Sequence, residues 1–472
     1  MEKRDVRSII TPSRLDVFTK TAFVRGQLSG EGERWASLLY SQYLDCIEPK
    51  NGFSENGTKF SLEDYVKDFR SLIESLRTHG FDCKFGCIPI GSDGIVNGSH
   101  RTAASLVMGL QVCVEESHEK NQKYDYKFLR EVDLNPDLID AVILDYCNQF
   151  SNIKILCLIG CEKNKFDEIV LGLEKTNKII YTQEIELSNI GARRIIQILY
   201  GLNDWWSEDL IEPLFLERFS TNKKKISFIF FHEESLEKVF GLKAKIRQNL
   251  HPGISFKTIH STDNQVESIR VAQCVLNANS VHYLNNAPIG SENNLSGILT
   301  SEFSKMPKLN RDKLVVVGSS VLEMYGIRQA ADIDVIHADS ESELIQKSKV
   351  VSSHNKEYRF FPLDISDLIN DPRLYFYSNG VKFMSLSILL FFKLNRYENK
   401  DIEDVKNVLD YKFGASLYSQ KRTQGLAIRK RRGLIVRKKV EGIISFLPDS
   451  WEIPIKSIYI KSRKYLKLFI SR

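Results

Sequence analysis

The chain has 472 residues, of which 42% are hydrophobic and 10% aromatic, values typical of globular proteins and not of disordered chains. At about 100–200 residues per domain, this length predicts about three domains. No apolar run is long enough for a membrane-spanning helix, and the charged opening MEKRDVRSII is unlike a signal peptide, so we expect a cytoplasmic protein.

Charge is distributed unevenly along the chain. The net charge is +6, but residues 413–472 contain 15 Lys and Arg against three acidic residues. The body of the protein is therefore mildly acidic and is followed by a basic tail. Apolar groups separate the basic clusters of the tail, a pattern that suits the anionic surface of a membrane at its inner face. Nucleic acid is the alternative partner of the tail, and a plain solvated tail is the simplest interpretation.

Strand-like and helical segments alternate, which predicts a multidomain protein of the α/β and α+β classes. We expect a first domain at residues 1–135, a mixed α/β middle domain at 136–299, a third domain at 300–412 and a basic amphipathic tail at 413–472. The eight cysteines are scattered and form no pattern of paired zinc ligands, so we expect buried thiols.

In the first domain, apolar residues from Tyr65 to Leu76 recur at helical spacing, and a short strand, a GSDG turn and a second short strand follow. The next segment, NGSHRTAAS at residues 97–105, predicts a turn that opens a helix. Backbone donors, the helix dipole and the Arg101 guanidinium would meet at this turn, a combination that suits a phosphate group. A helix-capping turn with a structural arginine is the alternative.

This segment resembles the signature D-G-x-H-R-x-x-A-A of the ParB/sulfiredoxin superfamily, which includes chromosome-partition proteins, sulfiredoxins and small-molecule kinases. The resemblance implies that Gly98, Ser99, His100 and Arg101 contact the phosphate of a nucleotide such as ATP or of a phosphorylated substrate, and kinase activity is one role that the superfamily offers for this domain. Ser99 stands where a sulfiredoxin needs cysteine, which argues against that chemistry. Asn97 replaces the usual aspartate of the signature, which weakens the kinase interpretation.

The middle domain contains the strand-like runs KILCLIG and KISFIFF and carries less functional information. In the segment IHSTDNQVE, Ser261 or Thr262 is expected to cap a helix that contains Glu267. A site for an acceptor or a phosphate is the alternative interpretation of this segment.

The third domain carries the strongest pattern, VVVGSSVLEMYGIRQAADIDVIH at residues 315–337. An apolar strand runs into Gly318 and Ser319, a helix follows, and Asp332 and Asp334 then share one face of a second strand. Two neighbouring carboxylates predict a hard divalent cation such as Mg2+. A glycine turn at the start of a helix predicts a phosphate, so the two halves together describe a triphosphate pocket.

The pattern resembles the DNA polymerase β-like nucleotidyltransferases, over about 110 residues of the chain. The resemblance implies Mg2+-dependent nucleotidyl transfer from a nucleoside triphosphate, ATP or CTP, with Asp332, Asp334 and a third carboxylate as catalytic metal ligands and Gly318 and Ser319 at the triphosphate. We expect Asp364, on an apolar strand, to be the third ligand. A glycosyltransferase D-x-D motif is the rival interpretation, and two aspartates that end a strand and bind nothing are the simplest one.

The two phosphate motifs together suggest an enzyme that phosphorylates and then activates a small metabolite or sugar phosphate for the biosynthesis of a surface polysaccharide. The first alternative is a toxin or defence nucleotidyltransferase that modifies tRNA or a protein. The second alternative is a non-catalytic scaffold that senses nucleotides.

Overall fold

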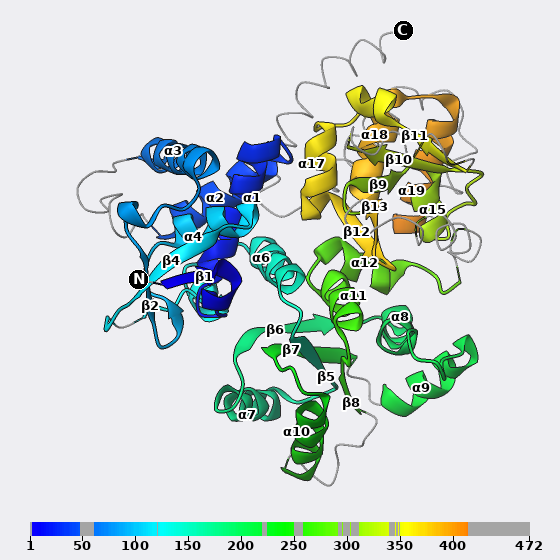
Figure 1. Ribbon diagram of the computed structural model, residues 1–472. Coiled ribbons are helices and arrows are strands. Elements are labelled where there is room, and N and C mark those ends of the chain that lie inside the picture. Colours follow the sequence, from blue (N-terminus) through cyan, green and yellow to red (C-terminus); the bar gives the residue numbers. More distant parts are fainter. Residues whose placement is uncertain are drawn as a thin grey trace, which may run out of the picture.

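The computed structural model describes residues 2–47, 61–119, 121–219, 224–249, 258–290, 295, 303, 311–338, 345, 348 and 350–413. It is a mixed α/β protein with three separate sheets of four, four and five strands, which confirms the predicted class (Figure 1). We call the parts around these sheets the N-terminal unit (residues 2–131), the middle unit (136–286) and the C-terminal unit (311–413). The expected tail lies outside the described residues.

The N-terminal unit has a mixed sheet in the order β1-β4-β2-β3. The predicted helical spacing is confirmed in α3, which begins with a capping box formed by Ser61 and Asp64 and buries Tyr65, Phe69, Ile73 and Leu76. The elements of this unit are β1 (Glu2–Asp5), η2 (Leu15–Val17), α1 (Phe18–Ser29), α2 (Glu33–Ile47), α3 (Leu62–His79), η4 (Cys83–Phe85), β2 (Ile88–Gly91), β3 (Gly94–Ile95), α4 (Ser99–Met108), β4 (Gln111–Glu116) and α5 (Tyr126–Glu131).

The middle unit has an antiparallel sheet in the order β6-β7-β5-β8, and the inner strands β5 and β7 are mostly apolar and are buried along nearly their whole length, because both faces of the sheet are covered. Helix α11 begins after Asn264, whose Oδ1 accepts from Glu267 N at 3.0 Å, so the expected cap at Ser261 or Thr262 is wrong. The elements are α6 (Pro136–Gln149), β5 (Ile153–Ile159), α7 (Lys163–Glu174), β6 (Ile179–Glu186), α8 (Asn189–Tyr200), α9 (Ile211–Arg218), β7 (Lys225–His232), α10 (Leu236–Asn249), β8 (Ile259–Ser261), α11 (Gln265–Val275) and α12 (Ala278–Asn286).

The C-terminal unit has a mixed sheet in the order β11-β10-β9-β13-β12. Strands β12 and β13 form a hairpin whose two-residue turn, Asn379-Gly380, has positive φ at both positions, as a tight hairpin requires. The elements are β9 (Leu314–Val317), α15 (Ser319–Met324), β10 (Ile333–His337), β11 (Val351–Ser353), α17 (Ile365–Asn370), β12 (Tyr375–Ser378), β13 (Val381–Met384), α18 (Leu386–Arg396) and α19 (Asn399–Phe413).

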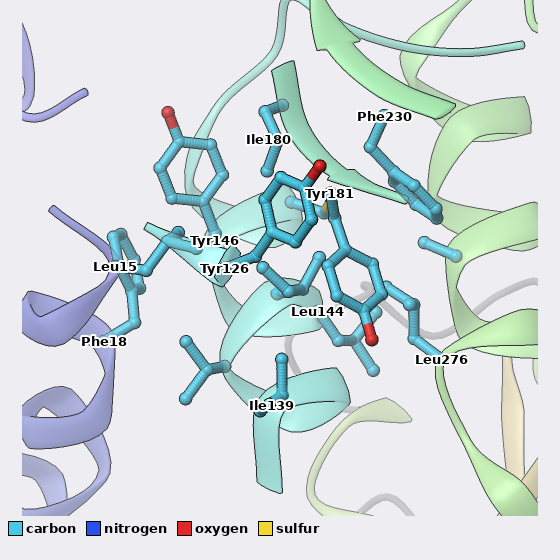
Figure 2. Close-up of a cluster of buried hydrophobic side chains, with 14 of the residues drawn as sticks. Leu15, Phe18, Tyr126, Ile139, Leu144, Tyr146, Ile180, Tyr181, Phe230 and Leu276 are labelled. Carbon is cyan, nitrogen blue, oxygen red and sulfur yellow. The ribbon is translucent and has the colours of Figure 1, made fainter. Parts of the chain in front are cut away.

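One hydrophobic cluster is shared by the N-terminal and middle units, a second fills the C-terminal unit and includes Tyr283 of α12, and a third lies within the middle unit. Figure 2 shows the shared cluster around α6, where Leu15 and Phe18 lie on one side of the helix and Tyr181 and Phe230 on the other. These two units therefore share a core across the boundary predicted near residue 135. The predicted domain boundaries stay predictions.

Helix α6 also buries a carboxylate in this shared core. Asp140 accepts hydrogen bonds from Tyr181 Oη at 2.7 Å and Gln183 Nε2 at 3.3 Å, and burial raises the pKa of its carboxyl to about 7. The folded protein therefore holds a proton that the unfolded chain releases near pH 4, so this group's contribution to stability falls as the pH rises from about 4 to 7.

We therefore expect Asp140→Asn to be more stable than the wild type at pH 8, by on the order of 2 kcal/mol, and similar to it at pH 5. Urea unfolding of both proteins at the two pH values measures this difference. An Asn variant that is equally destabilised at both values would show that Asp140 is needed as a charged group.

The cysteines only partly follow expectation. Cys83 and Cys113 form a disulfide that joins η4 to β4, so the expectation of a thiol is wrong for this pair, whereas Cys87, Cys147, Cys157 and Cys274 are buried thiols. Across the residues that the structure describes, no helix has the length and apolar character needed to cross a membrane.

Candidate active site in the C-terminal unit

The Gly318 turn and the Asp334 carboxylate lie directly against each other. Strands β9 and β10 are antiparallel neighbours, and Asp334 pairs with Val317, the residue before the turn. Gly318 has φ +70°, and a Cβ built on it would lie 2.7 Å from Asp334 Oδ2. Only glycine satisfies both the backbone conformation and this close approach.

The aspartate pair is placed as the strand pattern predicts on its apolar side, because Ile333 and Val335 are fully buried in the core of the unit. Asp332 lies just before β10 and is exposed, whereas Asp334 is 9% exposed. The carbonyl of Asp332 accepts a hydrogen bond from Ser320 Oγ at 3.0 Å. Helix α15, which begins at Ser319, is thereby tied to the residue that opens the carboxylate strand.

Two further polar residues, neither of them predicted as a site residue, reach Asp334 from β11 and from the position that follows it. Ser352 pairs with Asp334 across the parallel strands β11 and β10, and its Oγ donates to Asp334 Oδ1 at 2.8 Å. His354 Nε2 lies 3.2 Å from the same oxygen. The segment SSH at residues 352–354 has no family signature of its own, so only the strand pairing could have identified it.

The expected strand around Asp364 is wrong. Asp364 is the N-cap of α17, and its Oδ1 accepts from Asp367 N at 2.8 Å. Asp367 in turn accepts from Trp35 N of α2 at 3.1 Å, so this end of α17 contacts the N-terminal unit. The assignment of Asp364 as a third metal ligand stays a prediction.

The donor set suits a cation that arrives with its phosphates. Among the residues that the structure describes, no three His, Cys, Asp or Glu side chains form a group that could hold a metal ion. Mg2+ is commonly bound by one or two protein carboxylates together with substrate phosphates and water, and does not need a cage made of protein ligands alone. Asp334 lies beside the glycine turn and Asp332 lies two residues before Asp334, so their carboxylates would supply the hard oxygen atoms that this pattern needs.

A buried ionic cluster supports the loop before Asp332. Arg328 donates to both oxygens of Asp404 at 2.5 and 3.0 Å, and Lys393 lies 2.6 Å from Asp404 and 3.1 Å from Asp401. Burial alone would raise the pKa values of Asp401 and Asp404, but these partners, together with Arg396, keep both below the ordinary value. Arg328, which lies in the motif before Asp332, is thus tied to α19, and Lys393 of α18 lies between the two carboxylates.

In the N-terminal unit, Gly98 caps α4 with φ +90° and Ser99 begins the helix, as expected. The side chains that were expected to meet phosphate have other partners. His100 Nε2 lies 2.9 Å from Tyr40 Oη and its ring packs on the edge of Phe69, while Arg101 Nη1 donates to the Gly86 carbonyl at 3.0 Å. The phosphate role of these residues stays a prediction.

Beneath this turn lies a buried ionic group that has no motif in the sequence. Arg14, Asp16 and Lys20 are each at most 3% exposed, and Arg14 binds Asp16 through two hydrogen bonds of 2.9 Å. Burial would raise the pKa of Asp16, but Lys20, Arg14 and the Ser99 hydroxyl keep it far below its ordinary value. The group holds η2 and α1 against the start of α4.

Comparisons with known proteins leave the motif resemblances without independent support: no family model, no curated protein and no solved structure matches the chain.

Proposed function

We propose that the C-terminal unit is a Mg2+-dependent nucleotidyltransferase, with Asp332 and Asp334 as the metal ligands and the Gly318-Ser319 turn beside the triphosphate. The observation that carries the proposal is the contact of Asp334 Oδ2 with the position that a Cβ of residue 318 would occupy. It joins the two halves of the motif at one point of the sheet. The acceptor suggested by the sequence, a small metabolite or a sugar phosphate, stays a prediction.

Asp334 and Asp332 differ in burial, and we assign them different roles in binding the metal and the nucleotide. Asp334 is held by Ser352 and lies close to His354, so its carboxylate keeps one orientation before any ligand arrives. Asp332 is exposed and free to meet the phosphate side of a nucleotide. A bound Mg2+ would neutralise phosphate charge as the bond to the departing pyrophosphate breaks.

The proposal predicts binding of ATP, CTP, GTP or UTP that requires Mg2+ and is weakened by roughly 100-fold or more in Asp332→Asn and Asp334→Asn, since even changes behind a metal ligand cost about 10- to 100-fold. Calorimetric titration with and without Mg2+ measures it. Glu403→Gln, a change of an exposed carboxylate on α19, is the matched control and should bind as the wild type does.

Unchanged Mg2+-dependent affinity in Asp334→Asn would exclude the proposed site. Binding that needs the aspartates but produces no turnover with any small acceptor would direct attention to the scaffold alternative. Growth arrest on expression that Asp332→Asn abolishes would favour a macromolecular acceptor such as tRNA.

A further inference from the structure

A small, largely enclosed cavity of about 50 Å3 lies between the middle and C-terminal units. Its walls come from α8, α11 and α12 and from the hairpin of β12 and β13, and α11 and α12 lie next to β12 in Figure 1. The walls are firmly joined, because Tyr377 N donates to Ser280 Oγ at 2.9 Å and Asn279 Nδ2 donates to the Arg373 carbonyl at 2.8 Å.

Arg270 of α11 lines this cavity with a charge that the protein leaves almost unpaired. Its Nη2 makes one long hydrogen bond, 3.5 Å to the Gln197 carbonyl, and its buried Nε has no partner among the described residues. Desolvation lowers the pKa of this partly buried guanidinium, and the negative charge of Glu267 offsets the shift only in part, as expected for a cation without a contacting counter-ion. A guanidinium has five N–H donors, so most of the donors of Arg270 are available.

No acidic residue lines the cavity among the residues that the structure describes. Glu267 lies one turn before Arg270 on α11, but its oxygens lie 2.8 Å from His260 Nε2 and 2.7 Å from Asp263 N. Cys274 is neutral, because burial raises the pKa of its thiol to about 12. Arg194, the second arginine of the wall, donates to the Ala287 carbonyl at 2.8 Å and to Tyr283 Oη at 3.0 Å.

The other polar groups of the wall are neutral. Gln273 lies one turn after Arg270 on the same helix, and Asn379 and Gly380 close the cavity from the hairpin. At about 10–15 Å3 for each enclosed water molecule, the cavity of about 50 Å3 holds about three to five waters or one oxyanion of similar size, and is too small for a nucleotide.

We propose that this cavity binds a single small oxyanion of the size of inorganic phosphate, with the Arg270 guanidinium as its principal ligand. Guanidinium binds the oxygens of phosphate in pairs through its fixed fork of donors. The site is distinct from the nucleotide site, since none of Gly318, Asp332 and Asp334 lines it. It lies at the hairpin whose strand β13 runs beside β9, so an anion bound here would stabilise the junction of the two units.

The test is the phosphate dependence of the thermal unfolding temperature, with chloride used to keep the ionic strength constant. The wild type and the double variant Asp332→Asn/Asp334→Asn should both be stabilised by phosphate, because the cavity is intact in both. In Arg270→Gln the phosphate affinity should fall at least tenfold. Arg70→Gln, which removes an exposed charge on α3, is the control for general screening of positive charge and should respond as the wild type does.

A second readout separates a ligand-binding arginine from a structural one. In phosphate-free buffer, Arg270→Gln should unfold at a temperature equal to or higher than that of the wild type, since a partly buried charge without a contacting counter-ion has been removed. A variant that unfolds several degrees lower in that buffer would identify Arg270 as a structural residue and overturn the proposal. Phosphate stabilisation that survives in Arg270→Gln, or that disappears in the aspartate variant, would also overturn it.

Discussion

Substituting alanine for Gly318 should remove Mg2+-dependent nucleotide binding and destabilise the C-terminal unit together. The new Cβ would lie 2.7 Å from Asp334 Oδ2, so the carboxylate must leave its place between the turn and Ser352. The φ of +70° and ψ of −142° at residue 318 also belong to a region that is essentially restricted to glycine, at about 1–3 kcal/mol for another residue. Calorimetric titration and thermal unfolding measure the two effects.

Gly80 is a matched control for this substitution. Its φ of +69° and ψ of −167° impose a similar backbone strain, but no atom lies within 4 Å of the position that its Cβ would occupy. Backbone strain in Gly80→Ala should therefore lower the stability of the N-terminal unit by a similar free energy, and nucleotide binding should be unchanged. Normal nucleotide affinity in Gly318→Ala would mean that the contact of the turn with Asp334 has no role in binding.

The parts of the site that could be predicted are those encoded by local periodicity. Alternation along IDVIH places Ile333 and Val335 in the core, and the structure confirms it. The turn at Gly318 could also be predicted, because four apolar residues precede it and a short helix follows it. What no local pattern contains is the pairing of β11 with β10 that brings Ser352 and His354 to Asp334.

The errors have specific physical causes. The run RFFPLD at residues 359–364 is apolar because Phe361 stacks on Phe392 of α18 at 4.3 Å, and it forms no strand. The three-residue spacing from Asp364 to Asp367, and from Asn264 to Glu267, is typical of a helix N-cap and could have predicted both helix starts. The partner of His100 is Tyr40, which is 60 residues away in sequence, and no periodicity predicts such a contact.

Replacing Lys393 with methionine should cost the C-terminal unit about 3–5 kcal/mol, the range seen when one partner of a buried ion pair is removed. Lys393 is 3% exposed and its Nζ lies between Asp401 and Asp404, which are 0% and 2% exposed. Arg396 and Arg328 would remain, each with one of these carboxylates, but the central positive charge would be lost.

Because the partners keep the pKa values of Asp401 and Asp404 below the ordinary value, their ion pairs stabilise the protein above about pH 4 and lose this effect as the pH falls further. The loss of stability caused by Lys393→Met should therefore be largest near neutral pH and smaller in acid. Hydrogen exchange of the amides in α18 and α19 is the suitable measurement, since a multidomain protein need not unfold in two states.

Lys400→Met provides the comparison, because Lys400 is exposed and, within the described part of the chain, forms an ion pair only with the exposed Glu398, at 3.3 Å. An exposed pair of this kind contributes about 0–1 kcal/mol. Equal protection in both variants would show that the two arginines suffice to compensate the carboxylates. A loss of hydrogen-exchange protection in Lys393→Met but not in Lys400→Met would show that the loop before Asp332 depends on the buried cluster, since Arg328 connects that loop to the same Asp404.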